Sequence, residues 1–382
     1  KSISLDNTMN LDHAAITALN IFPSKTDTDK NMSLYGLLNK NKTYMGSTLL
    51  KEWLKAPLMD KVILNKRYDI VSYFIENALT RQSLRDEFLS ILPNLDNIIK
   101  KLQSKNAIKT CDLQIIVSIF QCVLLLPQIN QCLSNDCNNI LIEEEFIQPL
   151  DQQITYLNKF TQMCTSTIDF QALERHEYLI NPNFSNELKL LSNEKNDLYN
   201  QMKDLQLSIA DDIGVGEKDV KLQDANALGY HFRLSRKNEK HIRKNKSYRT
   251  LEMRKDGIRF TTNTMSSLSE QYKKITRQYN KISKNIIIKA IEITQTYIPV
   301  LETTSYILAH LDIYNSFAQV SSTSIKDYCR PNLLDKGNGI FILKESRHPM
   351  LEMIEGNNFI ANDCNIVKNQ SSLQIITGPN MG

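Results

Sequence analysis

The residues of this chain that most clearly suggest chemistry are its last five, Gly378-Pro379-Asn380-Met381-Gly382. They follow Leu373, Ile375 and Ile376, an apolar run that predicts a short buried strand. A glycine-rich turn directly after a strand is how a phosphate-binding loop begins, because the backbone N–H groups of such a turn point at an anion. Gly378 fits the first glycine of the pattern G-x-x-x-x-G-K-S/T, and the second glycine, the lysine and the hydroxyl residue would come next.

We therefore expect a fragment of a nucleotide-binding protein that stops inside its phosphate loop. A complete loop would bind ATP or ADP with Mg²⁺, because its lysine compensates phosphate charge and its Ser/Thr hydroxyl holds the metal. Without those two side chains this fragment alone should not hydrolyse ATP, so we predict no catalytic residue and no metal site within it. The alternative is an ordinary Gly-Pro turn after a strand.

Positive charge is concentrated in one short segment. The chain has 382 residues and a net charge of +4, yet residues 231–259 carry eleven basic side chains against three acidic ones. That segment is therefore +8 and the rest of the chain is −4. A segregated basic surface can neutralise phosphates along a duplex, although a solvated charged surface is the usual fate of such runs. The basic residues are Arg233, Arg236, Lys237, Lys240, Arg243, Lys244, Lys246, Arg249, Arg254, Lys255 and Arg259.

Heptad patterns on both sides of the basic segment predict two long helices. Apolar residues recur at alternating threes and fours from Leu188 to Ile209, and again from Met265 to Ile293. Lys195 and Lys289 each interrupt a seam, and we expect them to let the helices flex. Two seams of similar length around an insert of roughly fifty residues predict an antiparallel helical hairpin with the insert at its tip.

The insert has the two-residue alternation of β-strands. Tyr230, Phe232 and Leu234 alternate with polar residues, and residues 248–260 alternate around a turn at Asp256-Gly257. We therefore expect the basic residues to lie on a small β cap at the end of the two helical arms.

The segments outside the arms differ from each other in pattern. From Leu11 to about Ile180 apolar residues recur with helical spacing, which predicts a bundle of several helices. Its most apolar run, residues 115–126, is too short to span a bilayer and contains Gln121, so we expect no membrane association. After Pro331 short apolar segments are broken by glycine and proline, which indicates the start of an α/β domain.

Five strings of this chain resemble the MutS family of DNA mismatch-repair ATPases. MSLYGLLNKNKTYMGSTLLKEWLKAPLMD at 32–60 is similar to the lever-domain signature of that family, and ERHEYLINPNF at 174–184 to the start of its clamp. ESRHPMLE at 345–352, FIAND at 359–363 and IITGPNMG at 375–382 resemble the opening of its ATPase domain. The clamp and SRHP strings look most like the eukaryotic homologue that the MutSα and MutSβ heterodimers share.

The resemblance implies a mainly α fold. A helical lever bundle would carry a long antiparallel coiled-coil arm tipped by a small β clamp, followed by the start of an α/β P-loop ATPase domain. The expected boundaries are 1–184 for the core and lever, 185–286 for the clamp with its β tip at 217–262, 287–332 for the returning lever helices, and 333–382 for the truncated ATPase part.

Two groups of nucleotide-binding residues are implied by the resemblance alone. Residues 378–382 would wrap the phosphates, with Asn380 facing the nucleotide. Phe359, with Ile360, matches the position where the family stacks adenine, whereas an unrelated Phe here would be a core aromatic.

The resemblance also implies a DNA contact at the basic tip. The Arg254-Lys255-Asp256-Gly257 turn matches the family's hairpin that touches the DNA backbone, and Lys244 and Lys246 are further candidates in the same segment. Such contacts hold a duplex without reading its sequence.

The function implied is DNA mismatch repair by a nuclear protein. The complete subunit would pair with a second, mismatch-reading MutS homologue, clamp duplex DNA with mismatches or small loops, and use ATP to signal to MutL-type factors. Two alternatives stay open: a meiotic MutS homologue that clamps recombination intermediates, and an SMC-type coiled-coil ATPase. In the latter the arms should be far longer and the P-loop should precede them.

Overall fold

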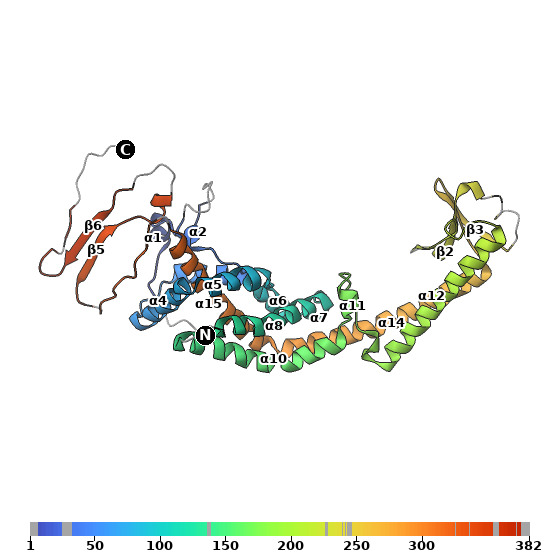
Figure 1. Cartoon of the computed structure of the whole chain (residues 1–382), viewed down its shortest axis with the longest axis horizontal. Coiled ribbons are helices and arrows are strands. Elements are labelled where there is room, and N and C mark those ends of the chain that lie inside the picture. The colour runs from blue at the N-terminus through green and yellow to red at the C-terminus, as the bar shows by residue number, and fades with distance from the viewer. Residues whose placement is uncertain are drawn as a thin grey trace. The chain divides into compact units, whose positions relative to one another are not determined.

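In the computed structural model of the 382-residue chain, the described residues are mainly helical and form two small antiparallel sheets (Figure 1). The chain divides into two compact units, one of residues 1–104, 118–159 and 297–382 and the other of residues 105–117 and 160–296. The expectation of a mainly α fold is confirmed. The structure describes residues 7–24, 33–135, 139–225, 228–238, 240, 242, 247–324, 326–335, 337–353, 359–371 and 373–375.

Short helices build the body of the first unit, and most begin at a side-chain cap. Ser33, Thr43, Asp60 and Asn94 each accept a hydrogen bond from a backbone N–H of the helix that follows, which satisfies donors left open at a helix start. The elements are α1 (His13–Ala18), α2 (Leu34–Leu38), α3 (Tyr44–Lys55), α4 (Lys61–Glu76), α5 (Ala78–Ser83), η3 (Leu84–Phe88), η4 (Leu89–Ile91), α6 (Leu95–Gln103), α9 (Ile140–Ile142), η5 (Glu143–Ile147) and α15 (Ile298–Thr323).

Helix α15 is the core of this unit. It is apolar around most of its circumference, with Leu308, Leu311 and Ile313 fully buried, and it packs against α3, α4 and α6. A helix that is hydrophobic all round belongs in an interior. Its position confirms that the body is a bundle of several helices.

One buried carboxylate of α15 fixes the start of α3. Asp312 has no exposed surface and accepts hydrogen bonds from Lys42 N at 3.0 Å, Thr43 N at 2.7 Å and Thr43 Oγ1 at 2.7 Å. A Cβ at Gly46 would lie 2.6 Å from Asp312 Oδ2, so a glycine is required for this approach. This contact explains the Thr-x-x-Gly pattern at the start of α3.

Helix α8 (Leu113–Ser134) is longer than the apolar run that the sequence marks out. By length and composition its 22 residues could cross a bilayer, which corrects the expectation of too short a span. Half of its most apolar window is nevertheless buried inside the protein, and Phe120, Leu126 and Ile129 are at most 4% exposed. This burial is typical of the core helix of a soluble protein.

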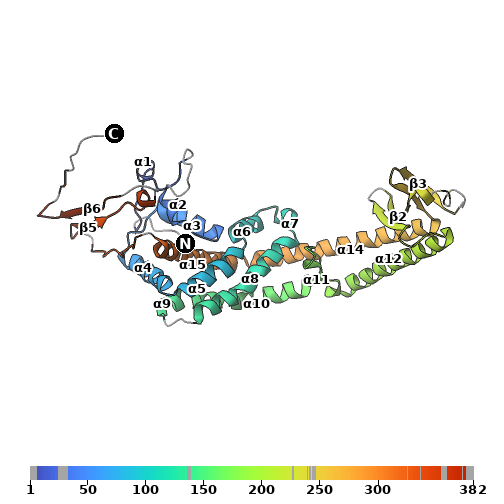
Figure 2. The same ribbon diagram turned by 45° about the horizontal axis from the view of Figure 1, so that its top comes forward.

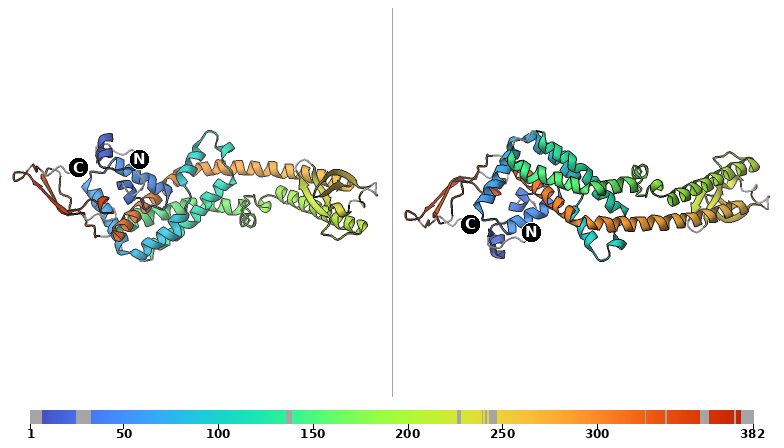
Figure 3. Two further views of the ribbon diagram at one scale, coloured as in Figure 1. Left: turned by 90° about the horizontal axis from the view of Figure 1, so that it is seen from above. Right: turned by 90° about the horizontal axis from the view of Figure 1, so that it is seen from below.

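Two long helices form the arms of the second unit, α12 (Asn186–Ile213) and α14 (Asn263–Thr296). They lie side by side in every view (Figures 1–3) and pack against each other. The heptad prediction is therefore confirmed. Lys195 fills its place in the seam, because its Nζ lies 5.7 Å from the ring centroids of both Tyr272 and Tyr279. Whether Lys195 and Lys289 let the arms flex stays a prediction.

Shorter elements complete the second unit. They are α7 (Ala107–Thr110), α11 (Phe170–Leu173) and η6 (Pro182–Phe184), and α10 (Gln148–Thr167) has residues in both units. Of these, η6 packs against α12 and α7 against α14. The hydroxyl of Ser185 accepts a hydrogen bond from Leu188 N at 3.2 Å and caps α12, which ends at Gly214 with φ of 70°.

A four-stranded antiparallel sheet occupies the tip of the arms, in the order β1-β2-β4-β3. Its strands are β1 (Lys221–Ala225), β2 (Gly229–Leu234), β3 (Arg249–Arg254) and β4 (Gly257–Thr261), with η7 (Arg236–Asn238) between β2 and β3. The β cap predicted from alternation is therefore confirmed. Its turn lies one residue earlier than expected, at Lys255-Asp256, because Arg254 pairs with Gly257.

Beyond α15, the described chain forms β5 (Ile340–Ser346), η8 (Leu351–Met353) and β6 (Asn362–Val367), with β5 and β6 antiparallel. The buried strand expected around Leu373 and Ile375 is wrong. Residues 373–375 form no strand, and these two side chains are 74% and 78% exposed. An apolar run becomes a buried strand only where a neighbour takes its backbone hydrogen bonds, and no described strand does so here.

Candidate nucleic-acid interface

The tip sheet has one apolar and one polar face. Phe232, Leu234, Ile258 and Phe260 are at most 1% exposed and belong to one buried cluster with apolar residues of α12 and α14, among them Met202. Successive residues of a strand point to opposite faces, so the residues between these apolar positions lie on the other side of the sheet.

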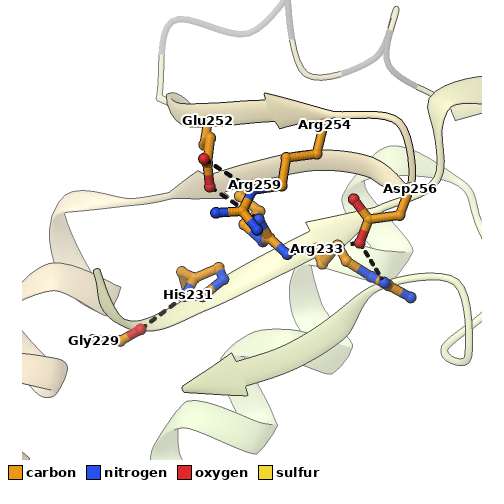
Figure 4. A network of polar contacts seen from close by, with 7 residues as sticks. All are labelled: Gly229, His231, Arg233, Glu252, Arg254, Asp256 and Arg259. Atoms are coloured by element: carbon orange, nitrogen blue, oxygen red, sulfur yellow. Dashed lines mark hydrogen bonds and ion pairs between the residues drawn. The ribbon is translucent and has the colours of Figure 1, made fainter. Parts of the chain in front are cut away.

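A row of charged residues crosses this polar face. Arg233 of β2 pairs in register with Arg259 of β4, and Arg259 pairs in turn with Glu252 of β3. Residues directly opposite each other share a face, so two arginines and one carboxylate stand side by side on three neighbouring strands. Figure 4 shows this row together with Arg254 and Asp256.

Ion pairs join these charges into one network. Glu252 Oε2 lies 2.9 Å from Arg259 Nη1, and Glu252 Oε1 lies 2.9 Å from Arg254 Nε. Asp256 Oδ2 lies 2.9 Å from Arg233 Nη1 and 3.6 Å from Arg259 Nη2 (Figure 4). Two carboxylates therefore hold three arginines, and Arg259 touches both carboxylates.

The arginines keep both carboxylates ionised. Hydrogen bonds from Arg254 and then Arg259 lower the pKa of Glu252. Desolvation acts to raise the pKa of Asp256, but the hydrogen bond from Arg233, a backbone hydrogen bond and the charge of Arg259 together lower it. The network thus carries a net charge of +1 at neutral pH.

The Lys255-Asp256 turn presents a cation at the end of this network. Lys255 is exposed, and Gly257 follows with φ of 142°. A Cβ at Gly257 would lie 2.2 Å from the carbonyl oxygen of Leu234, so only glycine fits this position.

The same segment of the tip carries other exposed cations. Within the described residues, no ion pair engages Arg236, Lys237, Lys240, Arg249 or Lys255. Unpaired and exposed cations are the groups best suited to contact phosphate oxygens. The tip therefore offers a basic surface whose sequence-independent contacts would suit a nucleic-acid backbone.

The residues predicted for DNA contact lie close together where the structure describes them. Arg254, Lys255, Asp256 and Gly257 form a single turn, in which Asp256 holds Arg233 and Gly257 permits the bend. Lys244 and Lys246 lie outside the described residues.

Sequence reasoning missed the pairing of Arg233, Arg259 and Glu252. All three were visible as charged positions within the alternating strands, but their contact depends on the register between strands far apart in sequence. The structure also shows a buried histidine on β2, His231. Its ring is 1% exposed, and Nδ1 lies 2.7 Å from the carbonyl oxygen of Gly229 (Figure 4).

The residues predicted to bind nucleotide are not assembled into a site by the described chain. Phe359 is partly buried and Ile360 is 79% exposed, just before β6. Residues 378–382 lie outside the described residues. Among the described side chains no group of His, Cys, Asp or Glu is arranged to hold a metal ion.

Comparison with known proteins identifies the family. Residues 14–318 match MutS domain III. The chain is 37% identical over 382 residues to "DNA mismatch repair protein MSH2" of Zea mays, covering 98% of this chain and 40% of that protein. It is 34% identical over 404 residues to the protein of the same name from Saccharomyces cerevisiae, covering 98% and 41%.

A bacterial protein is also similar over the same extent. The chain is 27% identical over 375 residues to "DNA mismatch repair protein MutS" of Finegoldia magna, covering 98% of this chain and 42% of that protein. The chain thus spans about two fifths of the relatives that it matches. The resemblance carried by the five sequence strings is confirmed, and the chain belongs to the MutS family.

Proposed function

We propose that this chain is the lever and clamp part of a MutS-type subunit that holds duplex DNA during mismatch repair. Family membership and the printed names of its relatives support mismatch repair as the process. The observation that carries the DNA contact is the exposed Lys255 in the β3–β4 turn, next to the arginine network, together with the exposed cations of the same tip segment that no described ion pair engages. A basic surface of this kind contacts phosphates and does not read bases.

The complete protein would use ATP or ADP with Mg²⁺, bound by residues 378–382 and the segment after them, with Phe359 against the adenine. It would act in the nucleus as a heterodimer with a second MutS homologue and signal to MutL-type factors. These proposals rest on the family, since the chain covers about two fifths of its relatives.

The proposed division of the chain follows the same family pattern. The core and lever would comprise 1–184, and the returning lever helices 287–332. The clamp would comprise 185–286 with its tip at 217–262, and the ATPase part would begin at 333.

Binding of the 382-residue chain to a fluorescent duplex across a salt titration tests the DNA contact. We expect equal affinity for matched and mismatched duplexes, because the tip contacts the backbone alone. The logarithm of the association constant should fall linearly with the logarithm of salt, by about 0.9 per phosphate contact.

Two charge-reversal variants make this test specific. Lys255→Glu removes an exposed cation at the turn, and we expect about tenfold weaker binding at low salt with a smaller salt slope. Lys284→Glu makes the same change on an exposed position of α14, away from the tip sheet, and should bind as the wild type does. Equal losses in both variants, or no binding by the wild type at low salt, would contradict the proposal.

A further inference from the structure

Arg254 differs from the other two arginines of the tip network in its exposure. Its side chain is 58% exposed, whereas the side chains of Arg233 and Arg259 are 26% and 14% exposed. Its ion-pair partner, Glu252, is 36% exposed. The Arg254–Glu252 contact is thus the most accessible of the close pairs in the network.

Glu252 also divides its two oxygens between two arginines. Oε1 contacts Arg254 Nε and Oε2 contacts Arg259 Nη1, each at 2.9 Å (Figure 4). If Arg254 moved to another anion, Glu252 would keep its contact with Arg259. The negative charge of Glu252 would therefore stay paired, and the free-energy cost of releasing Arg254 would be low.

A DNA phosphate is the anion best suited to replace Glu252. It offers two oxygens to the planar guanidinium, as a carboxylate does, and bidentate arginine–phosphate pairs are strong charge-assisted contacts. An exposed ion pair such as Arg254–Glu252 contributes little to stability and is screened by salt. The exchange therefore replaces the weak Arg254–Glu252 contact with an Arg254–phosphate contact, which also neutralises a phosphate charge of the duplex.

We propose that Glu252 is an internal stand-in for phosphate, which holds Arg254 in the unbound tip and gives it up to the DNA backbone. Arg233 and Arg259 are positioning residues that stay on the carboxylates and keep the turn in shape. This inference rests on the proposed DNA contact of the tip and adds a regulation to it. Glu252 lowers the affinity for isolated anions and for DNA, so that release of Arg254 requires a duplex phosphate at the correct place.

Substitution of Glu252 and Arg254, singly and together, tests the exchange. Glu252→Gln keeps a hydrogen-bond acceptor but removes the charge, and should bind a 20-base-pair duplex about two- to fivefold more tightly than the wild type. Arg254→Gln should bind more weakly and lower the salt slope by about 0.9. In the double variant, Glu252→Gln should give no gain, because there is no arginine to release.

A matched control separates this exchange from general electrostatics. Glu217→Gln removes an exposed negative charge in the loop before β1, where no described ion pair engages the carboxylate. We expect it to leave affinity nearly unchanged. Equal tightening by Glu217→Gln, or an undiminished gain from Glu252→Gln in the Arg254→Gln background, would overturn the inference.

A measurement on the wild-type chain avoids any effect of substitution on folding. With arginine side chains labelled by ¹⁵N, addition of the duplex should shift the Nε resonance of Arg254 and leave those of Arg233 and Arg259 close to their unbound positions. The opposite pattern would overturn the exchange while leaving DNA binding intact. Absence of binding by the wild type would instead overturn both the proposed function and this inference.

Discussion

The helical body and the tip sheet each contain an aspartate that contacts other elements of the chain, but in opposite environments. Asp312 is fully buried and accepts three hydrogen bonds from Lys42 and Thr43, at distances of 2.7–3.0 Å. Asp256 is exposed, and its partners are the arginine side chains Arg233 and Arg259. The first carboxylate is fully buried together with the Thr43 donors, whereas the side chain of the second is 46% exposed to water.

This difference separates fixed contacts from exchangeable ones. A buried carboxylate that caps backbone N–H groups cannot be removed without leaving those donors unsatisfied. An exposed ion pair competes with water and salt at all times, so an incoming phosphate can replace one partner. The contacts of Asp312 therefore fix the structure of the body, whereas exposed ion pairs at the tip can exchange their partners.

The largest expected effect is on the Asp312 contact. Asp312→Ala leaves the N–H groups of Lys42 and Thr43 without their acceptor, that of Thr43 in a buried contact, and it removes the charge that most strongly raises the pKa of the buried Arg85. We expect a loss of about 3–5 kcal/mol in the free energy of unfolding of this unit. Urea unfolding followed by the fluorescence of Trp53, the only tryptophan, reports on α3 directly.

An exposed aspartate is the control for this loss. Asp204→Ala changes an exposed position of α12 and should alter the free energy of unfolding by less than about 0.5 kcal/mol. If Asp312→Ala were no more harmful than Asp204→Ala, the contrast between fixed and exchangeable carboxylates would be wrong.

Acidification provides a second test of the body. Burial lowers the pKa of His310 to about 4; the hydrogen bond with the Tyr306 carbonyl opposes this shift, and the charge of Arg67 reinforces it. In the unfolded chain this histidine binds its proton near pH 6.5. Its contribution to the free energy of unfolding is therefore fully present above that pH and is lost as the pH drops towards 4. The loss would approach about 3 kcal/mol over this interval.

The His310→Phe variant isolates this contribution, because it keeps a ring and removes the titrating group. Urea unfolding of the wild type and the variant is followed by Trp53 fluorescence at pH 7 and pH 4.5. The difference between the two pH values gives the loss in free energy of unfolding for each protein. We expect a smaller acid loss in the variant. Equal losses in the two proteins would mean that other groups account for the acid sensitivity of this unit. Asp312 is not one of them, because burial raises its pKa and a raised carboxyl pKa stabilises the folded state as the pH falls.

Gly257 gives a smaller effect that is confined to the tip. Gly257→Ala would place a methyl group 2.2 Å from the Leu234 carbonyl oxygen at a φ of 142°, and should destabilise the β3–β4 pair by about 2 kcal/mol. Gly214→Ala is the matched control, because φ there is 70° but nothing lies within 4 Å. Hydrogen exchange of the β3 and β4 amides should accelerate in the first variant only.

Local patterns in the sequence predicted the arms and the tip strands, while the contacts between distant strands could not be predicted from them. The seams from Leu188 and Met265 are long and periodic, so helical packing follows from them. The contact between Arg233 and Arg259 depends on which strand lies beside β2, and a register shift between Thr250 and Glu252 moves β3 relative to β4. The strand expected at Leu373 failed for a related reason, since no neighbouring strand is described beside it.

The smallest expected effect is also the most direct comparison of the two carboxylates. Asp312→Asn and Asp256→Asn are the same isosteric change at a buried and at an exposed site. The first should lower the free energy of unfolding, because a neutral amide is a weaker acceptor for the N–H groups of Lys42 and Thr43 and opposes Arg85 less. The second should leave the unfolding transition unchanged within error, because water and salt replace what Arg233 loses. A stability loss in Asp256→Asn that persists in 0.5 M salt would show that the Asp256 pair is a fixed structural contact, and the contrast between the buried and the exposed aspartate would then be wrong.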